Sequence, residues 1–195
     1  GRRLKEGGAR GTTGATAQLP CQPGSFSISG SSECTPCSAG KYAASERAIE
    51  CVSADPGCFV AEESASKEEP CPAGSHASGS GNSECTLCES GKYAASIKSP
   101  ECKRASRGYY AGEAGATSPK KCEVGRYAPG EGSSSCTDAN AGFFVADEAA
   151  KKQTPCPPGS YSATAASTCE LCEAGTFSKR PGEASCTSCP AGSSS

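Results

Sequence analysis

Residues 21–45 read CQPGSFSISGSSECTPCSAGKYAAS, and this stretch contains one complete unit of a repeat that runs through nearly the whole chain. Each unit carries a glycine, and successive glycines are 17 residues apart, with two steps of 16. The sequence holds 24 glycines among 195 residues, so eleven in register are not a coincidence. A fixed short period is typical of stacked repeats. We therefore expect an array of small units, each touching only its neighbours. The eleven glycines are Gly24, Gly40, Gly57, Gly74, Gly91, Gly108, Gly125, Gly142, Gly159, Gly175 and Gly192.

The composition excludes an ordinary globular core. Leu, Ile, Val and Phe together number 16, about 8% of the chain, which would normally indicate disorder. Sixteen cysteines reverse that interpretation, because small units that cannot build a core are held by disulfides instead. Such a cysteine density predicts an oxidising compartment. We expect an extracellular or cell-surface protein that passes through the secretory pathway.

The charge and hydropathy of the chain indicate which kinds of partner it does not have. The formal net charge is −2, from 19 basic and 21 acidic residues, and no stripe of one sign runs along the chain. This distribution gives no case for nucleic acid binding. No apolar run approaches the roughly 18 residues of a membrane span. The chain has no initiator Met and no signal peptide, so we expect a fragment of a longer, exported protein.

The units can be aligned on the recurrent glycine, which we call slot 4. Slot 1 is Cys in eight of eleven units and Ala in the other three, and slot 6 is Phe or Tyr in nine of ten units. The exception in slot 6 is His76. Residues 1–20 are expected to form an N-terminal segment or a degenerate unit. Units 1 to 11 start near residues 21, 37, 54, 71, 88, 105, 122, 139, 156, 172 and 189.

The three units with Ala in slot 1 provide a test of disulfide pairing. A second cysteine follows slot 1 by 13 or 14 residues, but these three units hold Glu68, Pro119 and Gln153 there. Both cysteines are missing together each time, as expected if they are partners. A loop of this size is stabilised by roughly 3 kcal/mol in the chain-entropy model. We predict the pairs Cys21–Cys34, Cys37–Cys51, Cys71–Cys85, Cys88–Cys102, Cys122–Cys136, Cys156–Cys169 and Cys172–Cys186.

Two cysteines remain outside this scheme, Cys58 and Cys189. We expect Cys189 to pair with a residue beyond the end of this chain. Within each unit we expect a turn, a short strand through slot 6, a second turn and a short returning strand. Glycine in slot 4 suits a positive-φ turn or a close backbone approach. The predicted fold class is small disulfide-rich repeats: an elongated array of about ten 17-residue units with short β-hairpins and little helix.

The repeated motif is Cys-x-Pro/Ala-Gly-x-Tyr/Phe-Ser, then a Gly/Ser turn and Cys-x-x-Cys, as in CPPGSYSATAASTCELCEAGTFSKRPGEASCTSCPAG. It resembles the ephrin-receptor-like cysteine-rich repeat, also called GCC2/GCC3, over residues 21–195. It is also similar to the first submodule of tumour-necrosis-factor-receptor repeats, where such a cysteine pair is bonded. The resemblance implies an extracellular, disulfide-laddered rod. Such repeats occur in receptors, in secreted matrix proteins and in large surface proteins of protists and algae.

The Cys-x-x-Cys motifs have three interpretations: a zinc knuckle, a redox dithiol, or the end of one loop beside the start of the next. Zinc usually needs two converging pairs 12–20 residues apart. Here 48 residues separate Cys37 from Cys85, and no βαβ pattern surrounds any pair. The sequence favours adjacent loops. His76, the only histidine, occupies the aromatic slot and is interpreted as a structural stand-in. We find no nucleophile elbow, carboxylate pair or phosphate loop, and predict no enzyme, metal or cofactor.

The three bridge-free units, which are units 3, 6 and 8, carry extra apolar bulk in slot 5. Bridged units with a complete loop have Ser, Thr, Lys or Arg there. One interpretation is compensation, with this side chain filling the space of the missing bridge. The other is an exposed patch for a partner chain. Exposure of the slot 5 aromatics distinguishes the two. The candidate contact residues are Cys58, Phe59, Tyr109, Tyr110, Phe143 and Phe144.

The sequence leads to two hypotheses for the function of this protein. The first is a non-enzymatic structural or assembly module of an extracellular or surface-appendage protein, a stapled rod with lateral contacts to other protein chains, a second copy or a filament included. The alternative is a receptor-type ectodomain that binds a protein ligand. The many Ser and Thr residues permit O-glycans without specifying them.

Overall fold

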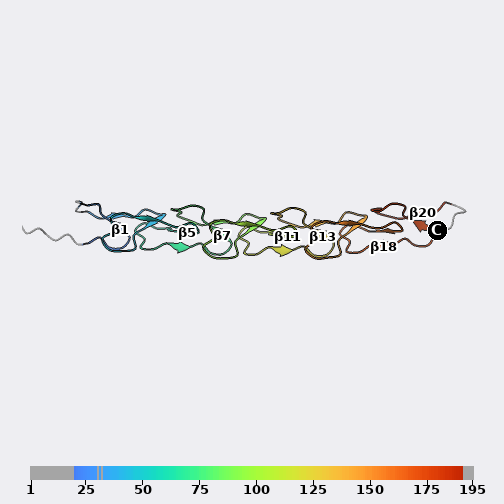
Figure 1. Ribbon diagram of the computed structural model, residues 1–195, viewed down its shortest axis with the longest axis horizontal. Coiled ribbons are helices and arrows are strands. Elements are labelled where there is room, and N and C mark those ends of the chain that lie inside the picture. Colours follow the sequence, from blue (N-terminus) through green and yellow to red (C-terminus); the bar gives the residue numbers. More distant parts are fainter. Residues whose placement is uncertain (1–19, 30, 32, 191–195) are drawn as a thin grey trace, which may run out of the picture.

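The computed structural model describes residues 20–29, 31 and 33–190. In Figure 1 the units follow one another along a single long axis, and the colour runs from blue at one end to red at the other. The described chain is therefore a thin rod. The segment 1–20, except for its last residue, lies outside the described residues, as does Gly192.

Ten β-hairpins make up the rod, and the described residues contain no helix. Every hairpin is a separate two-stranded antiparallel sheet with two residues in each strand. This confirms the predicted fold class. The pairs are β1 (Ser25–Phe26) with β2 (Thr35–Pro36), β3 (Lys41–Tyr42) with β4 (Val52–Ser53), β5 (Cys58–Phe59) with β6 (Glu69–Pro70), β7 (Ser75–His76) with β8 (Thr86–Leu87), β9 (Lys92–Tyr93) with β10 (Lys103–Arg104), β11 (Tyr109–Tyr110) with β12 (Lys120–Lys121), β13 (Arg126–Tyr127) with β14 (Thr137–Asp138), β15 (Phe143–Phe144) with β16 (Thr154–Pro155), β17 (Ser160–Tyr161) with β18 (Glu170–Leu171), and β19 (Thr176–Phe177) with β20 (Thr187–Ser188).

Slots 5 and 6 form the first strand of each hairpin, and the second strand begins directly after the position of the second cysteine. In unit 2, Tyr42 lies opposite Val52 and Lys41 lies opposite Ser53. The N–H of the next residue, Ala54, then donates to the carbonyl of Gly40 at 2.9 Å, which closes the hairpin at its base. The strands stay short because the slot 4 turn ends them on one side and the loop ends them on the other.

Each unit is bonded to the next through its backbone. The slot 4 N–H donates to the slot 7 carbonyl of the following unit, for example from Gly24 to Ala43 at 2.8 Å and from Gly57 to Ala77 at 2.8 Å. The same bond recurs in nine successive units, from Gly24 to Gly159. Isolated two-stranded hairpins are marginal in water. These bonds give every hairpin a fixed place on its neighbour.

Contacts also reach the next unit but one, so the expectation that units touch only their neighbours is wrong. A Cβ atom built on Gly24 of unit 1 would stand 2.6 Å from the carbonyl carbon of Ser64 in unit 3. Gly24 also has a φ of 93°. Slot 4 therefore needs glycine for both of the reasons expected, the positive φ and the close approach. The loops are long enough, and the rod thin enough, for one loop to reach past its neighbour.

A second position with positive φ recurs in the loops, and the sequence did not reveal it. It lies ten residues after slot 1, or nine in unit 9, and from unit 3 onward its carbonyl meets the slot 4 glycine two units earlier. Only some units have glycine there, so no period stands out in the sequence. The residues are Arg47, Ser64, Gly81, Lys98, Gly115, Gly132, Ala149, Ala165 and Gly182.

The core of the rod is a line of small side chains. Slot 1 is almost completely buried from unit 1 to unit 9, whether it is a bonded cysteine or an alanine such as Ala54 or Ala105, and slot 7 is buried from unit 2 to unit 10. Slot 7 holds Ala in five units, and Val60 and Val145 in two of the bridge-free units. The slot 6 aromatics are mostly half-buried. Close backbone packing leaves room for little more than a methyl group or a sulfur at the axis.

Candidate functional site

Seven disulfides form a ladder along the rod, and each closes its own hairpin. Their Cα atoms are 5.6 Å apart in the first and 5.7 Å apart in the other six. In three of the four Cys-x-x-Cys motifs the two cysteines belong to different disulfides, and in the fourth Cys186 is bonded whereas Cys189 is not. The pairs are the seven that the joint loss of cysteines led us to expect: Cys21–Cys34, Cys37–Cys51, Cys71–Cys85, Cys88–Cys102, Cys122–Cys136, Cys156–Cys169 and Cys172–Cys186. Cys58 and Cys189 are free.

In unit 3 a carboxylate replaces the missing bridge. Glu68 stands at the second-cysteine position, and its Oε2 accepts a hydrogen bond from the backbone N–H of Asp55 at 2.6 Å. Its Oε1 lies 3.4 Å from Nζ of Lys98, which belongs to unit 5 and also lies 3.6 Å from Oδ2 of Asp55. The two ends of the hairpin loop are thus clasped by polar contacts instead of sulfur.

The free thiol of Cys58 lies beside this clasp. The residue is only 2% exposed. Burial raises the pKa of the thiol, and the neighbouring Glu68 raises it further. Burial also acts to raise the pKa of Glu68, but the hydrogen bond from Asp55 and the contacts with Cys58 and Lys98 together lower it. Cys58 is therefore a neutral, enclosed thiol, and thiolate chemistry is disfavoured there.

In unit 8 a side-chain amide replaces the missing disulfide, as the carboxylate does in unit 3. Oε1 of Gln153, at the second-cysteine position, accepts a hydrogen bond from the backbone N–H of Asn140 at 2.7 Å. In unit 6 the corresponding residue is Pro119, whose side chain has no acceptor. These clasps were missed from the sequence. The available signal was that Glu68 and Gln153 both place a carbonyl oxygen where other units have the second sulfur.

The slot 5 residues of the bridge-free units have different surroundings. Cys58 is buried, and the ring of Phe143 lies against Gly182 of unit 10, 3.4 Å from a Cβ built there. Tyr109 is 36% exposed. Cys58 and Phe143 thus pack against the rod, whereas Tyr109 is exposed as a contact patch would require. The six candidate contact residues lie in three separate hairpins; two of their strands, β5 and β11, both lie along the lower edge of the view in Figure 1.

Each bridge-free loop encloses a surface hollow. The hollows of units 3, 6 and 8 measure about 430, 430 and 700 Å³, and they are lined mainly by residues 60–69, 110–120 and 144–154. The largest has Phe144 at its wall, with Asp147, Lys151 and Arg107 at its margin. These open, mixed-charge hollows hold no histidine and no paired nucleophile and base.

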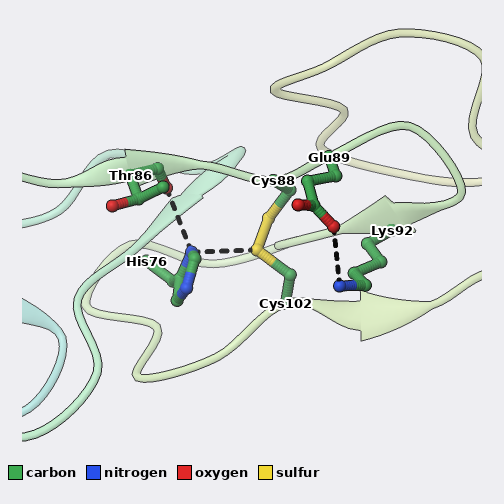
Figure 2. A network of polar contacts seen from close by, with 6 residues as sticks. All are labelled: His76, Thr86, Cys88, Glu89, Lys92 and Cys102. Atoms are coloured by element: carbon green, nitrogen blue, oxygen red, sulfur yellow. Dashed lines mark hydrogen bonds and ion pairs between the residues drawn. A yellow bond between two sulfur atoms is a disulfide. The ribbon is translucent and has the colours of Figure 1, made fainter.

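His76 lies against the disulfide of the following unit (Figure 2). Its Nδ1 is 3.0 Å from the carbonyl oxygen of Thr86 and 3.2 Å from Sγ of Cys102. Cys102 is bonded to Cys88, and the three residues form the one cluster of metal-ligand type found in the described part of the chain. In the oxidised chain the two sulfurs are bonded to each other. His76 itself occupies the aromatic slot as a half-buried ring.

The chain was compared with known proteins. Residues 74–122 and 159–195 match the family model described as tyrosine-protein kinase ephrin type A/B receptor-like. No curated protein matched the chain. Among the described residues there is no helix of the length and apolarity needed to cross a membrane. The disulfide ladder and the family match together indicate a protein of extracellular type. These two segments of the chain are similar to the ephrin receptor-like cysteine-rich repeat family.

Proposed function

We propose that this chain is a non-enzymatic spacer, a stiff segment of a larger extracellular or cell-surface protein that holds other parts at a distance. The observation that carries the proposal is the backbone bond from slot 4 to slot 7 of the next unit, which recurs in the same direction through nine units. A repeated bond of this kind adds length without folding the chain back. An extended rod of this kind offers reach.

Local crosslinks support a mechanical role. Every disulfide spans only 13 or 14 residues, so each hairpin is held independently of the rest of the rod. Tension that opens one unit therefore leaves the staples of the others in place. In two of the three units without a disulfide, Glu68 and Gln153 hold the loop by hydrogen bonds. We infer that the bridge-free units are the compliant points of the rod.

The lateral contacts of such a spacer would be made with other protein chains, a second copy included. Tyr109 is the slot 5 aromatic that supports this part of the proposal, because it is exposed on strand β11. The other large exposed apolar residues are scattered over the rod, with two in unit 2 and no more than one in any other unit, and such scattered residues are ordinary on a protein surface. Tyr109 with its neighbour Tyr110 is the first place to test.

Solution scattering on the oxidised chain tests the spacer directly. A compact globule of 195 residues would have a radius of gyration of about 16 Å. A rod predicts a markedly larger radius and a scattering curve with a cross-section regime. Electron microscopy of the same material shows whether single rods or laterally associated filaments are present. A radius at the compact value would contradict the proposal.

A receptor-type ectodomain is the second candidate, and the family match favours it because that family is described by a receptor. This function requires a monomeric rod that captures one protein ligand. Tyr109→Ala would then abolish capture while leaving the radius of gyration unchanged. In a plain spacer the same substitution changes only association between chains.

A further inference from the structure

His76 is unlike the residue at this slot in every other described unit. The other nine units place a Phe or Tyr ring there, and only unit 4 places a ring with nitrogen donors. Figure 2 shows the imidazole facing the Cys88–Cys102 disulfide of unit 5. The ligand atoms of His76, Cys88 and Cys102 all lie within 4.8 Å of one another. One imidazole and two sulfurs on adjacent units therefore share one small volume.

This donor set suits zinc. Zn²⁺ binds thiolate sulfur at about 2.3 Å and imidazole nitrogen at about 2.0–2.1 Å in tetrahedral geometry. Those bond lengths place two ligand sulfurs about 3.8 Å apart and a nitrogen about 3.5 Å from each sulfur. Nδ1 of His76 is already 3.2 Å from Sγ of Cys102, and the Cα atoms of the two cysteines are 5.7 Å apart. Side-chain rotation alone would bring the sulfurs to zinc-binding distances.

We propose that His76, Cys88 and Cys102 form a zinc site. The site cannot bind zinc in the oxidised chain, and it becomes able to do so when a dithiol reductant cleaves the Cys88–Cys102 disulfide. The reductant forms its own disulfide and supplies two electrons and two protons, so both cysteines become thiols. Zinc then binds as each thiol releases a proton to solvent. The neutral imidazole binds through Nδ1 with its proton on Nε2, and it gives up the contact with Thr86.

The imidazole also favours reduction of the Cys88–Cys102 disulfide over the other six. A disulfide becomes easier to reduce when its reduced form is stabilised, and the imidazole nitrogen 3.2 Å from Sγ of Cys102 can donate a hydrogen bond to the sulfur that is released. The other slot 6 rings are Phe or Tyr and have no ring nitrogen to offer. Water completes the tetrahedron, and the carboxylate of Glu89, paired with Lys92 at 2.9 Å, lies beside the site (Figure 2). Zinc would thus hold unit 5 closed after its disulfide is lost.

The experiment uses the full oxidised chain. Dithiothreitol is titrated until about one disulfide per chain is open, and is then removed under nitrogen. Zn²⁺ is added, and the free thiols are alkylated and mapped by mass spectrometry. We expect Cys88 and Cys102 to be the first pair opened, and their alkylation to slow at least tenfold with zinc. Cobalt substitution gives an independent readout, since a thiolate-to-cobalt charge-transfer band should appear with one metal per opened chain.

Two variants make the test specific. His76→Phe installs a ring that other units carry in this slot, and it should lose both the early opening and the zinc protection. Tyr110→His is the matched gain-of-function variant, because Tyr110 and Cys136 of the next disulfide line one common hollow. It should create the same behaviour at Cys122–Cys136. The proposal is overturned if another disulfide opens first, if zinc leaves the alkylation of Cys88 and Cys102 unchanged, or if His76→Phe behaves like the parent chain.

Discussion

Gly74 and Gly115 lie in direct backbone contact although they belong to units 4 and 6. A Cβ atom on Gly74 would stand 2.9 Å from the carbonyl carbon of Gly115 and closer still to its oxygen. The same relationship links Gly24 to Ser64 and Gly108 to Ala149. The rod is therefore held by contacts between next-but-one units as well as by bonds between neighbours, which explains how hairpins of four strand residues can stack in a fixed order.

Gly74→Ala should destabilise the rod far more than Gly79→Ala. Both glycines have positive φ, 86° and 72°, so both variants carry the conformational strain of about 1 kcal/mol. Only at Gly74 does the new methyl group meet backbone, whereas nothing lies within 4 Å of a Cβ at Gly79. We expect a loss of roughly 3 kcal/mol for Gly74→Ala, measured by denaturant unfolding of the oxidised chain. Equal losses in the two variants would show that the next-but-one contact has no energetic weight.

Glu68 should contribute stability that depends on pH. Its pKa in the folded chain is lowered from the ordinary value of 4.5, because the Asp55 hydrogen bond and the contacts with Cys58 and Lys98 outweigh the opposing effect of burial. A carboxyl whose folded pKa is depressed stabilises the fold above the unfolded pKa, and that stability is lost as pH falls through the folded pKa. Glu68→Ala should therefore cost about 1–2 kcal/mol near neutral pH and progressively less below about pH 4.

Glu68→Gln is the matched control for that prediction. Gln153 shows that an amide oxygen at this position can accept the slot 2 N–H, so this variant keeps the hydrogen bond and loses only the charge. Its stability should vary less with pH than that of the parent chain between pH 3 and about pH 6. A parent chain and a Glu68→Gln chain with identical pH profiles would contradict the role given to the carboxylate.

A disulfide should form if unit 8 is given the two cysteines that it lacks. Ala139→Cys with Gln153→Cys places sulfurs at slot 1 and at the second-cysteine position, 14 residues apart as in most of the other disulfides. The new bridge should stabilise the unit by about 3 kcal/mol, less the loss of the Gln153 hydrogen bond. Thiol titration and hydrogen exchange of unit 8 measure the outcome. Gln153→Cys alone should only destabilise, and a double variant that keeps two free thiols after oxidation would refute the equivalence of the units.

Ala149→Gly should stabilise the rod, against the usual effect of glycine. Ala149 has a φ of 54°, in the left-handed region that is strained for any residue with a Cβ. Relief of that strain should exceed the entropic cost of glycine and give a gain of about 0.5 kcal/mol. Ala150→Gly, next to it and without positive φ, should lose about as much. Denaturant unfolding of the two variants side by side decides between strain relief and a general effect of glycine.

Much of this fold could be predicted from the local sequence pattern of each unit. The joint absence of Cys from Ala54 and Glu68, and from Ala139 and Gln153, led to hairpins closed within each unit. The recurrent glycine marked the tight turn, and the low content of large apolar residues excluded a globular core. These features depend on interactions inside about 17 residues, which a repeated sequence displays many times over.

Long-range geometry could not be obtained in the same way. The second positive-φ position holds Arg47, Lys98 and Ala149 in some units and glycine in others, so no residue type marks it. Phe143 packs against Gly182, two units further along the rod, whereas Tyr109 is exposed, and no feature of the two slot 5 residues distinguishes them in the sequence. The sequence by itself determined the unit, its crosslink and its repetition, because those follow from local chemistry. Only the tertiary structure decided that loops reach the next unit but one, and that His76 faces a disulfide, because stacking brings together residues that no short-range pattern connects.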